Sequence, residues 1–118
     1  MGKHVLVCDD DADTIELVVG LLETEGHQVS AVRNCESIWK VIEANTPDLI
    51  FMDLWMQKMG GEATTRLLKK NHKTRKIPVI LLSASKDIEK AAQRTGADGY
   101  LAKPFKIKEL LEVVDSIK

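Results

Sequence analysis

The sequence predicts an α/β fold: one five-stranded, doubly wound parallel sheet with helices on both faces. Two observations predict it. Short apolar runs alternate with segments of helical periodicity five times along the 118 residues. Most of these runs are apolar throughout rather than at every second position, which is typical of parallel strands buried on both faces. Right-handed crossovers are then expected between successive strands.

The first half of the chain supplies three strands and two helices. Apolar residues at i, i+3, i+4 and i+7 mark the first helix, and Gly26 is a natural stop after it. The second helix is marked by Ile38, Val41 and Ile42 and must end before Pro47. The predicted elements are strands at 5–8, 28–32 and 49–52, a helix at 12–25 and a helix around 38–42.

The second half repeats the pattern. Gly60 and Gly61 interrupt the chain before a helix that carries Leu67 and Leu68, and Gly96 ends the next helix. The remaining predicted elements are strands at 79–82 and 100–102 and helices at about 86–95 and 107–117. Five β-α units of this length favour the strand order 2-1-3-4-5 of the flavodoxin-like (βα)5 arrangement. No linker or repeat interrupts them, so residues 1–118 are expected to form a single domain.

The composition limits the class of protein. Hydrophobic residues make up 44% and charged residues 30% of the chain, and the net charge is −1. No basic excess indicates direct nucleic-acid binding, and no apolar run is long enough for a membrane span. No signal peptide is visible at the N-terminus, and Cys8 and Cys35 have no metal-type spacing. We therefore expect a soluble cytoplasmic protein with two reduced thiols.

Polar residues close the apolar runs where ligands bind in such sheets, at the carboxyl ends of the strands. These residues are Asp9, Asp10 and Asp11 after the first run, Asp53 after the third, Ser83 after the fourth and Lys103 after the fifth. Clustered carboxylates repel one another, and a hard divalent cation such as Mg²⁺, or Mn²⁺ in its place, removes the conflict. Asp53 could then attack phosphorus while Lys103 and the metal neutralise the phosphoryl oxygens and Ser83 donates a hydrogen bond.

Four segments carry a resemblance to a known family. They are Val-Leu-Val-Cys-Asp-Asp-Asp at 5–11, Pro-Asp-Leu-Ile-Phe-Met-Asp-Leu-Trp-Met at 47–56, Leu-Leu-Ser-Ala at 81–84 and Gly-Ala-Asp-Gly-Tyr-Leu-Ala-Lys-Pro-Phe at 96–105. In this order and spacing, the chain resembles the bacterial response-regulator receiver family over its whole length. The resemblance implies that Asp53 is the phosphoacceptor. It implies metal ligands at Asp10, Asp53 and the backbone carbonyl of Trp55, and at Asp9 through water.

The same resemblance implies roles around the acceptor. Ser83, Lys103 and the backbone of Ala84 would hold the phosphoryl group, and Ser83 and Tyr100 would form the switch. Trp55 and Ser85 would flank the route of attacking water, so the bulk of Trp55 is expected to alter the lifetime of the phosphoryl group. Further matches and departures are Gly61 as the glycine after the acceptor, a cis peptide before Pro104, and Gln57 where the family commonly has proline.

The implied function is a two-component signalling switch rather than a conventional turnover enzyme. A histidine kinase or a histidine phosphotransfer protein would donate the phosphoryl group. Residues 86–118 would then present the change to a downstream protein that the sequence does not identify. No nucleic acid or membrane partner is expected, and the protein is expected to be a monomer, with dimerisation on phosphorylation left open.

Other interpretations exist for each residue taken singly. Asp53 could be a turn residue, Lys103 a solvated lysine, Ser83 a helix N-cap, and Tyr100 an amphipathic residue at a strand end. An acidic cap is expected at Asp11 or Asp13.

Alternative functions also remain to be weighed for the whole chain. A small phosphohydrolase with an aspartate nucleophile would place a second acid where Trp55 stands. A degenerate receiver used only for protein contact would not need the intact set of polar residues. A flavin-binding module of this topology would need a phosphate-binding loop after the first strand, and none is present.

Overall fold

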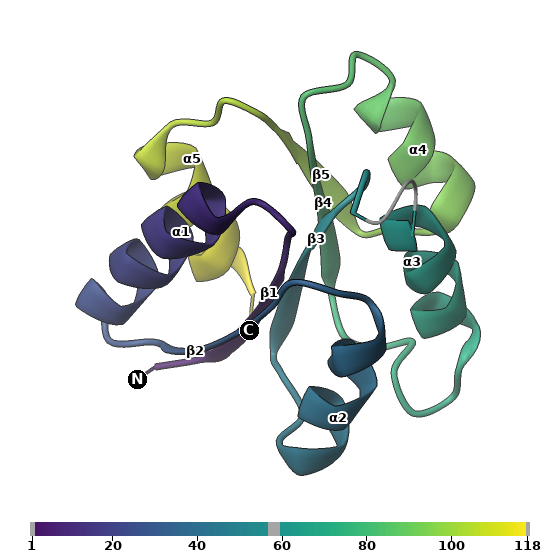
Figure 1. Ribbon diagram of the computed structural model, residues 1–118, viewed down its shortest axis with the longest axis horizontal. Helices are drawn as coiled ribbons and strands as arrows, with labels where there is room; N and C mark the ends of the chain where they lie inside the picture. The colour runs from purple at the N-terminus through teal and green to yellow at the C-terminus, as the bar shows by residue number, and fades with distance from the viewer. Residues whose placement is uncertain (1, 57–59, 118) are drawn as a thin grey trace.

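The computed structural model describes residues 2–56 and 60–117 as a five-stranded parallel sheet between two layers of helices (Figure 1). The strand order is β2-β1-β3-β4-β5, which confirms the predicted order. The strands are β1 (His4–Cys8), β2 (Gln28–Val32), β3 (Leu49–Asp53), β4 (Val79–Ser83) and β5 (Gly99–Ala102). The helices are α1 (Ala12–Thr24), α2 (Glu36–Ala44), α3 (Gly60–Lys70), α4 (Ile88–Thr95) and α5 (Ile107–Ser116).

The apolar strands divide their side chains between two cores, as the pleat requires. α1 and α5 cover one face of the sheet, and α2, α3 and α4 cover the other (Figure 1). The first core is formed by Val5, Val7, Leu49, Phe51, Ile80 and Leu82 against Val18, Leu22, Leu110 and Val114. The second is formed by Leu6, Cys8, Ile50, Met52, Val79 and Leu81 against Ile38, Ile42, Leu68, Ile88 and Ala91.

Local side chains set the helix ends. Asp11 caps α1, because its carboxylate accepts hydrogen bonds from the Asp13 backbone N–H at 3.1 Å and the Thr14 hydroxyl at 2.7 Å. Gly26 and Gly96 follow α1 and α4 with φ angles of 88° and 82°, a left-handed conformation that glycine adopts without a steric penalty. The cap at Asp11 and both glycine stops confirm the predictions from the sequence.

The start of α4 differs from the prediction. The helix begins at Ile88, after Asp87, and not near residue 86. Ser85 Oγ accepts a hydrogen bond from the Asp87 backbone N–H at 3.1 Å, so the preceding residues form a turn instead of a helical first turn. Ser83 lies at the end of β4 and is not the N-cap of α4, which removes one alternative for its role.

The helices do not have the form of membrane spans. None of those within residues 2–56 and 60–117 combines the length and the apolar character that crossing a bilayer requires.

Candidate functional site

Three carboxylates meet at the carboxyl end of the sheet. Asp9 and Asp10 directly follow β1, and Asp53 ends β3. These strands are paired neighbours, with Cys8 opposite Met52, so the residues that follow them come together. One carboxylate oxygen from each of the three lies within 4.8 Å of the others. Asp9 and Asp53 are buried, whereas Asp10 is exposed, so the cluster opens to solvent on one side.

Lys103 brings a cation to the cluster. The residue follows β5, and its backbone N–H donates to the carbonyl of Ser83 at 2.8 Å, which ties it to the end of β4. Its Nζ lies 2.7 Å from Asp9 Oδ2 and 3.9 Å from Asp53 Oδ1. The other oxygen of Asp9 accepts the Asp11 backbone N–H at 2.9 Å. Both oxygens of this fully buried carboxylate are therefore hydrogen-bonded.

The surroundings of Asp53 disfavour its ionised form. Burial and the charge of Asp9 raise the pKa of Asp53 to about 6, and the charge of Asp10 adds to the rise. Lys103 and a hydrogen bond from the Trp55 backbone N–H act in the opposite direction without cancelling it. Any further positive charge placed beside Asp53 would therefore stabilise its ionised form.

Ser83 and Ser85 line the same edge of the sheet from β4. Ser83 is buried, with 1% of its surface exposed. Its Oγ accepts the Ser85 backbone N–H at 3.0 Å, which leaves its own hydroxyl hydrogen available to a further acceptor. Ala84 lies between the two serines and lines a hollow that also contains Lys103. Lys103 and Ala84 thus line the hollow, and the buried Ser83 directly precedes Ala84 in the chain.

The two aromatic residues with predicted roles are both exposed. Trp55 has half of its surface exposed, and its backbone N–H lies 3.4 Å from Asp53 Oδ1. Tyr100 is 42% exposed and stands on β5, the last strand of the sheet. This position is compatible with both predicted roles of Tyr100, as a switch residue and as an amphipathic residue at a strand end. Gln57, which stands where the family commonly has proline, lies outside the described residues.

Gly61 is required by close backbone contact. A Cβ atom at this position would collide with the backbone carbonyl of Asp53, and it would lie 3.0 Å from the carbonyl oxygen of Leu54. The start of α3 can therefore pass the acceptor loop only with glycine here. The Lys103–Pro104 peptide bond is cis. Both features match what the family resemblance implied.

Sequence reasoning missed two polar contacts. Arg33 follows β2 directly, and its Nη2 donates to the backbone carbonyl of Asp10 at 2.9 Å, so it steadies the acidic loop. The sequence could have indicated this contact, because Arg33 follows the strand that neighbours β1. Glu62 of α3 binds Arg94 of α4 through two hydrogen bonds of 2.7 and 3.1 Å. No pattern in the sequence pairs these residues, because they lie 32 positions apart.

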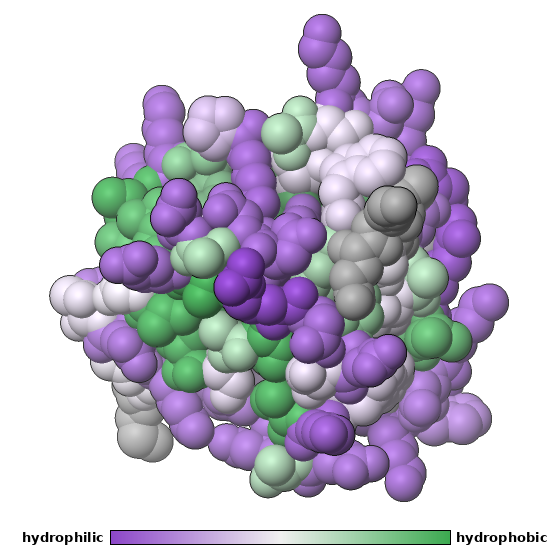
Figure 2. All heavy atoms as spheres, in the orientation of Figure 1, coloured by the Kyte–Doolittle hydropathy of each residue, from purple (hydrophilic) through white to green (hydrophobic). Residues whose placement is uncertain are grey.

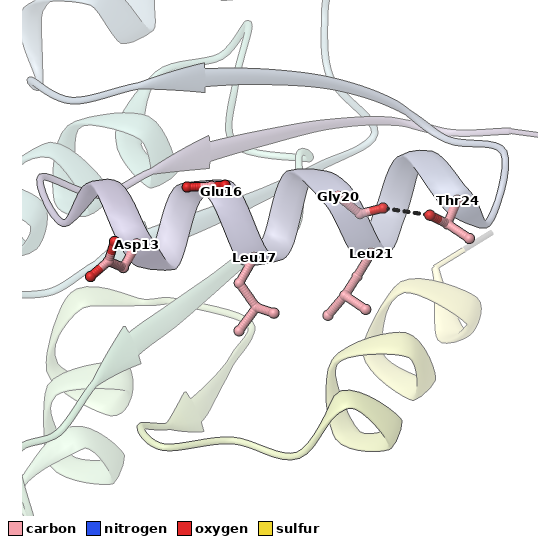
Figure 3. A pocket seen from close by; sticks show the side chains of 6 residues that line it. All are labelled: Asp13, Glu16, Leu17, Gly20, Leu21 and Thr24. Carbon is pink, nitrogen blue, oxygen red and sulfur yellow. Dashed lines mark hydrogen bonds between the residues drawn. The ribbon is translucent and has the colours of Figure 1, made fainter.

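Two hollows lie near α1. The larger, of about 530 Å³, runs along the helix and includes Leu17 and Leu21, which point from α1 toward the C-terminal part of the chain (Figure 3). Its lining includes the carboxylates of Asp13 and Glu16 but none of Asp9, Asp10 and Asp53. The second, of about 320 Å³, contains Leu17, Lys103 and Phe105 and opens beside the polar cluster. The second hollow is therefore joined to the carboxylate cluster through Lys103, which pairs with Asp9 and Asp53.

Comparison with known proteins identifies the family. The model of the response regulator receiver domain matches residues 5–115. The chain is 32% identical to the nitrogen assimilation regulatory protein NtrX of Azorhizobium caulinodans, over 98% of this chain and 26% of NtrX. It is 34% identical to the phosphate regulon transcriptional regulatory protein PhoB of Pseudomonas aeruginosa, over 94% of this chain and 49% of PhoB. The chain thus spans half or less of these two relatives.

A solved structure of a receiver domain shares the fold of the chain. The receiver domain of a sensor histidine kinase from Pseudomonas aeruginosa, with a magnesium ion coordinated in its active-site cleft, has a TM-score of 0.85 and 26% identity to the chain. The match covers 98% of this chain and 96% of that domain. The fold, the acidic cluster and the family match over residues 5–115 lead to one conclusion: the chain belongs to the response regulator receiver domain family.

Proposed function

We propose that Asp53 accepts a phosphoryl group from a phosphohistidine and that the chain acts as a two-component signalling switch. The observation that carries the proposal is the meeting of Asp9, Asp10 and Asp53 within 4.8 Å beside the ammonium of Lys103. An Oδ atom of Asp53 attacks phosphorus as the P–N bond of the donor breaks. The bond pair stays on the imidazole nitrogen, and an aspartyl phosphate forms.

The donor set fits Mg²⁺, with Mn²⁺ as a substitute. Hard divalent cations prefer oxygen ligands, and Mg²⁺ keeps several waters, which suits a cluster with one exposed carboxylate. We assign Asp10, Asp53 and the backbone carbonyl of Trp55 as direct ligands and Asp9 as a ligand through water. When bound, the ion neutralises charge on the transferred phosphoryl oxygens. The raised pKa of Asp53 supports this assignment, because it reflects burial and negative charge that Lys103 does not fully offset.

The protein's own groups hold the phosphoryl oxygens. Lys103 Nζ lies close enough to Asp53 to bind one of them after a small movement away from Asp9. Ser83 has a hydroxyl hydrogen to donate, and the backbone N–H of Ala84 is assigned to the same task. The hollow of about 320 Å³ beside Lys103 would receive the imidazole of the donor, whether a histidine kinase or a histidine phosphotransfer protein.

The switch would act on the α4-β5-α5 face, which includes residues 86–117 of the described chain. Ser83 would move toward the phosphoryl group and release space near β5. Tyr100, now 42% exposed, would turn inward to fill it. Such a ligand-driven shift between two pre-existing states changes which partner binds. We assign an unidentified downstream protein as that partner and propose a cytoplasmic, monomeric single domain over residues 1–118, with no direct contact to nucleic acid or membrane.

The lifetime of the aspartyl phosphate would depend on Trp55 and Ser85. Trp55 lies two residues after the acceptor, and the Ser85 backbone N–H donates to Ser83 Oγ at 3.0 Å. A bulky side chain at position 55 would restrict attacking water. The alternative of a phosphohydrolase gains no support, because Trp55 carries no acid–base group where such an enzyme needs one.

Intact-mass measurement tests the proposal. The protein is incubated with a small phosphodonor such as acetyl phosphate and Mg²⁺, alongside the Asp53→Asn variant and a sample with EDTA. We expect one added phosphoryl group on the wild type only, and only with the metal. Equal labelling of both proteins would refute the acceptor assignment. Sustained release of phosphate from a monoester substrate would favour the phosphohydrolase instead.

A further inference from the structure

Positive charge is concentrated in one short stretch of the chain. Six of the 17 Lys and Arg residues lie between residues 66 and 76, and no Asp or Glu lies there. This stretch therefore carries a formal charge of +6, whereas the rest of the chain carries −7 to reach the total of −1. It comprises the end of α3 and the loop that leads to β4. Figure 2 shows hydrophilic side chains gathered around this end of the molecule, at the lower right.

Two of the six cations have structural partners. Lys69 Nζ donates to the backbone carbonyl of Ile77 at 2.9 Å and to Asp98 at 2.7 Å, and Arg66 pairs with Glu62 at 3.0 Å. The other four are exposed and form no ion pair with any residue in 2–56 or 60–117. We call these four residues the basic ridge: Lys70, Lys73, Arg75 and Lys76.

The loop holds the basic ridge in a defined shape. Asn71 accepts the backbone N–H groups of Thr74 and Arg75 at 3.1 and 2.8 Å. The buried Thr74 hydroxyl donates to the carbonyl of Leu68 at 2.6 Å, which fastens the loop to α3. Lys69 adds the contact to Ile77 at the far end of the loop. Cations on a fastened loop are partly preorganised, so binding loses less conformational entropy.

An apolar groove adjoins the ridge. Trp39 of α2 and Leu67, Lys70 and Asn71 of α3 and its end line a hollow of about 480 Å³, which we call the α2–α3 groove. Leu67 is 57% exposed, the highest fraction among the exposed large hydrophobic residues of the described chain. Lys70 belongs to both the groove and the basic ridge. An apolar floor with a cationic border is the complement of an amphipathic acidic segment.

We propose that the α2–α3 groove and the basic ridge together form a docking site for an acidic, amphipathic peptide segment of a partner protein. An aliphatic or aromatic side chain of the partner would contact Trp39 and Leu67. Its carboxylates would pair with Lys70, Lys73, Arg75 and Lys76. The end of α3 lies about 15 Å along the helix from its start near Asp53, so a bound segment would leave the acceptor uncovered.

The observations favour a protein segment over a nucleic acid. Nucleic acids bind through phosphate contacts along a positive surface, and an exposed leucine in the middle adds nothing to such contacts. A polyanion longer than the basic ridge would also meet the remainder of the protein, whose formal charge is −7. A short acidic segment with one apolar anchor avoids both problems.

Peptide selection tests the site without using phosphorylation, so its result is separable from the acceptor chemistry. Random 12-residue peptides displayed on phage are selected against the folded, unphosphorylated chain. Enriched peptides are then mapped by amide chemical-shift changes. We expect acidic sequences with an apolar anchor, and shifts at Trp39 and residues 66–77. The Lys73→Glu/Lys76→Glu variant should weaken binding at least tenfold, and Leu67→Ala several-fold.

The matched control is Lys90→Glu/Lys108→Glu, which reverses the same number of charges at exposed positions elsewhere. It should bind the selected peptides as the wild type does. A single-stranded DNA of equal charge serves as the competing ligand. Absence of acidic enrichment, shifts that map elsewhere, or DNA binding that equals peptide binding and ignores Leu67→Ala would each overturn the proposal.

Discussion

Replacing Asp53 with Asn should stabilise the metal-free protein at neutral pH. In the folded chain, burial and the charge of Asp9 raise the pKa of Asp53 from 3.8 to about 6. Between these two pH values, Asp53 is therefore protonated in the folded state but already ionised in the unfolded chain. Stability of the wild type falls as the pH rises through this window, and the full penalty is present above about pH 6. Asn carries no charge and has no such penalty.

The magnitude follows from the shift. About two pKa units correspond to roughly 3 kcal/mol, which is an upper limit. Coulomb's law gives a similar scale, because two unit charges at 4.8 Å, the limit within which the carboxylate oxygens lie, repel by about 3.5 kcal/mol at an effective dielectric of about 20. Asn also removes the 3.9 Å contact with Lys103, which keeps its 2.7 Å contact with Asp9. We expect a net gain of roughly 1–3 kcal/mol.

Urea unfolding in EDTA measures the effect. Wild type and Asp53→Asn are compared from about pH 4 to about pH 8. The difference between their free energies of unfolding should increase as the pH rises. Asp115→Asn, an exposed change on α5, serves as the control and should shift stability by less than about 0.5 kcal/mol. Added Mg²⁺ should stabilise the wild type and have little effect on Asp53→Asn. A variant that is less stable than the wild type at neutral pH in EDTA would refute the reasoning.

Three further predictions concern the surroundings of the site. Trp55→Asn should speed loss of the phosphoryl group by up to about tenfold, equivalent to about 1.4 kcal/mol, and an unchanged rate of dephosphorylation by mass spectrometry would eliminate the lifetime role. Gly61→Ala should lower the free energy of unfolding by about 1–3 kcal/mol, because its Cβ meets the Asp53 carbonyl, and an unaltered urea midpoint would show that the loop yields without cost. Arg94→Met should lower the free energy of unfolding, because it removes both hydrogen bonds to the buried carboxylate of Glu62. Since the Arg94 guanidinium lowers the pKa of Glu62, that loss should be present above about pH 4.5 and fade as the pH falls, and a pH-independent loss would exclude the ion pair as its cause.

Much of the fold was predictable because buried parallel strands have a distinctive pattern. Strands such as β3 and β4 are apolar throughout, and the positions of Gly26 and Gly96 indicated where two helices stop. Helix starts were predicted less accurately: α3 already includes Gly60 and Gly61, which were expected to precede it, and α4 begins two residues later than expected. Ser85 and Asp87 form a turn there through a local hydrogen bond that competes with the first helical turn.

The candidate site was predictable as a set of residues but not as a geometry. Because ligands bind at the carboxyl ends of parallel strands, the sequence predicted that Asp9, Asp10, Asp53 and Lys103 lie together, although they come from distant parts of the chain. It could not say that Lys103 Nζ lies 1.2 Å closer to Asp9 than to Asp53, at 2.7 against 3.9 Å. That preference depends on side-chain packing across three strands.

The amino-acid sequence by itself determined the architecture, the family and the identity of the polar residues, because periodicity and strand-end position are local properties of the chain. Only the tertiary structure decided how these residues share charge, because pKa values depend on burial and on neighbours that are far apart in sequence. It also placed Glu62 against Arg94, brought Leu67 beside Trp39, and left the four cations of the basic ridge without acidic partners among the described residues. For Asp53, the sequence named the residue, and the fold raised its pKa to about 6.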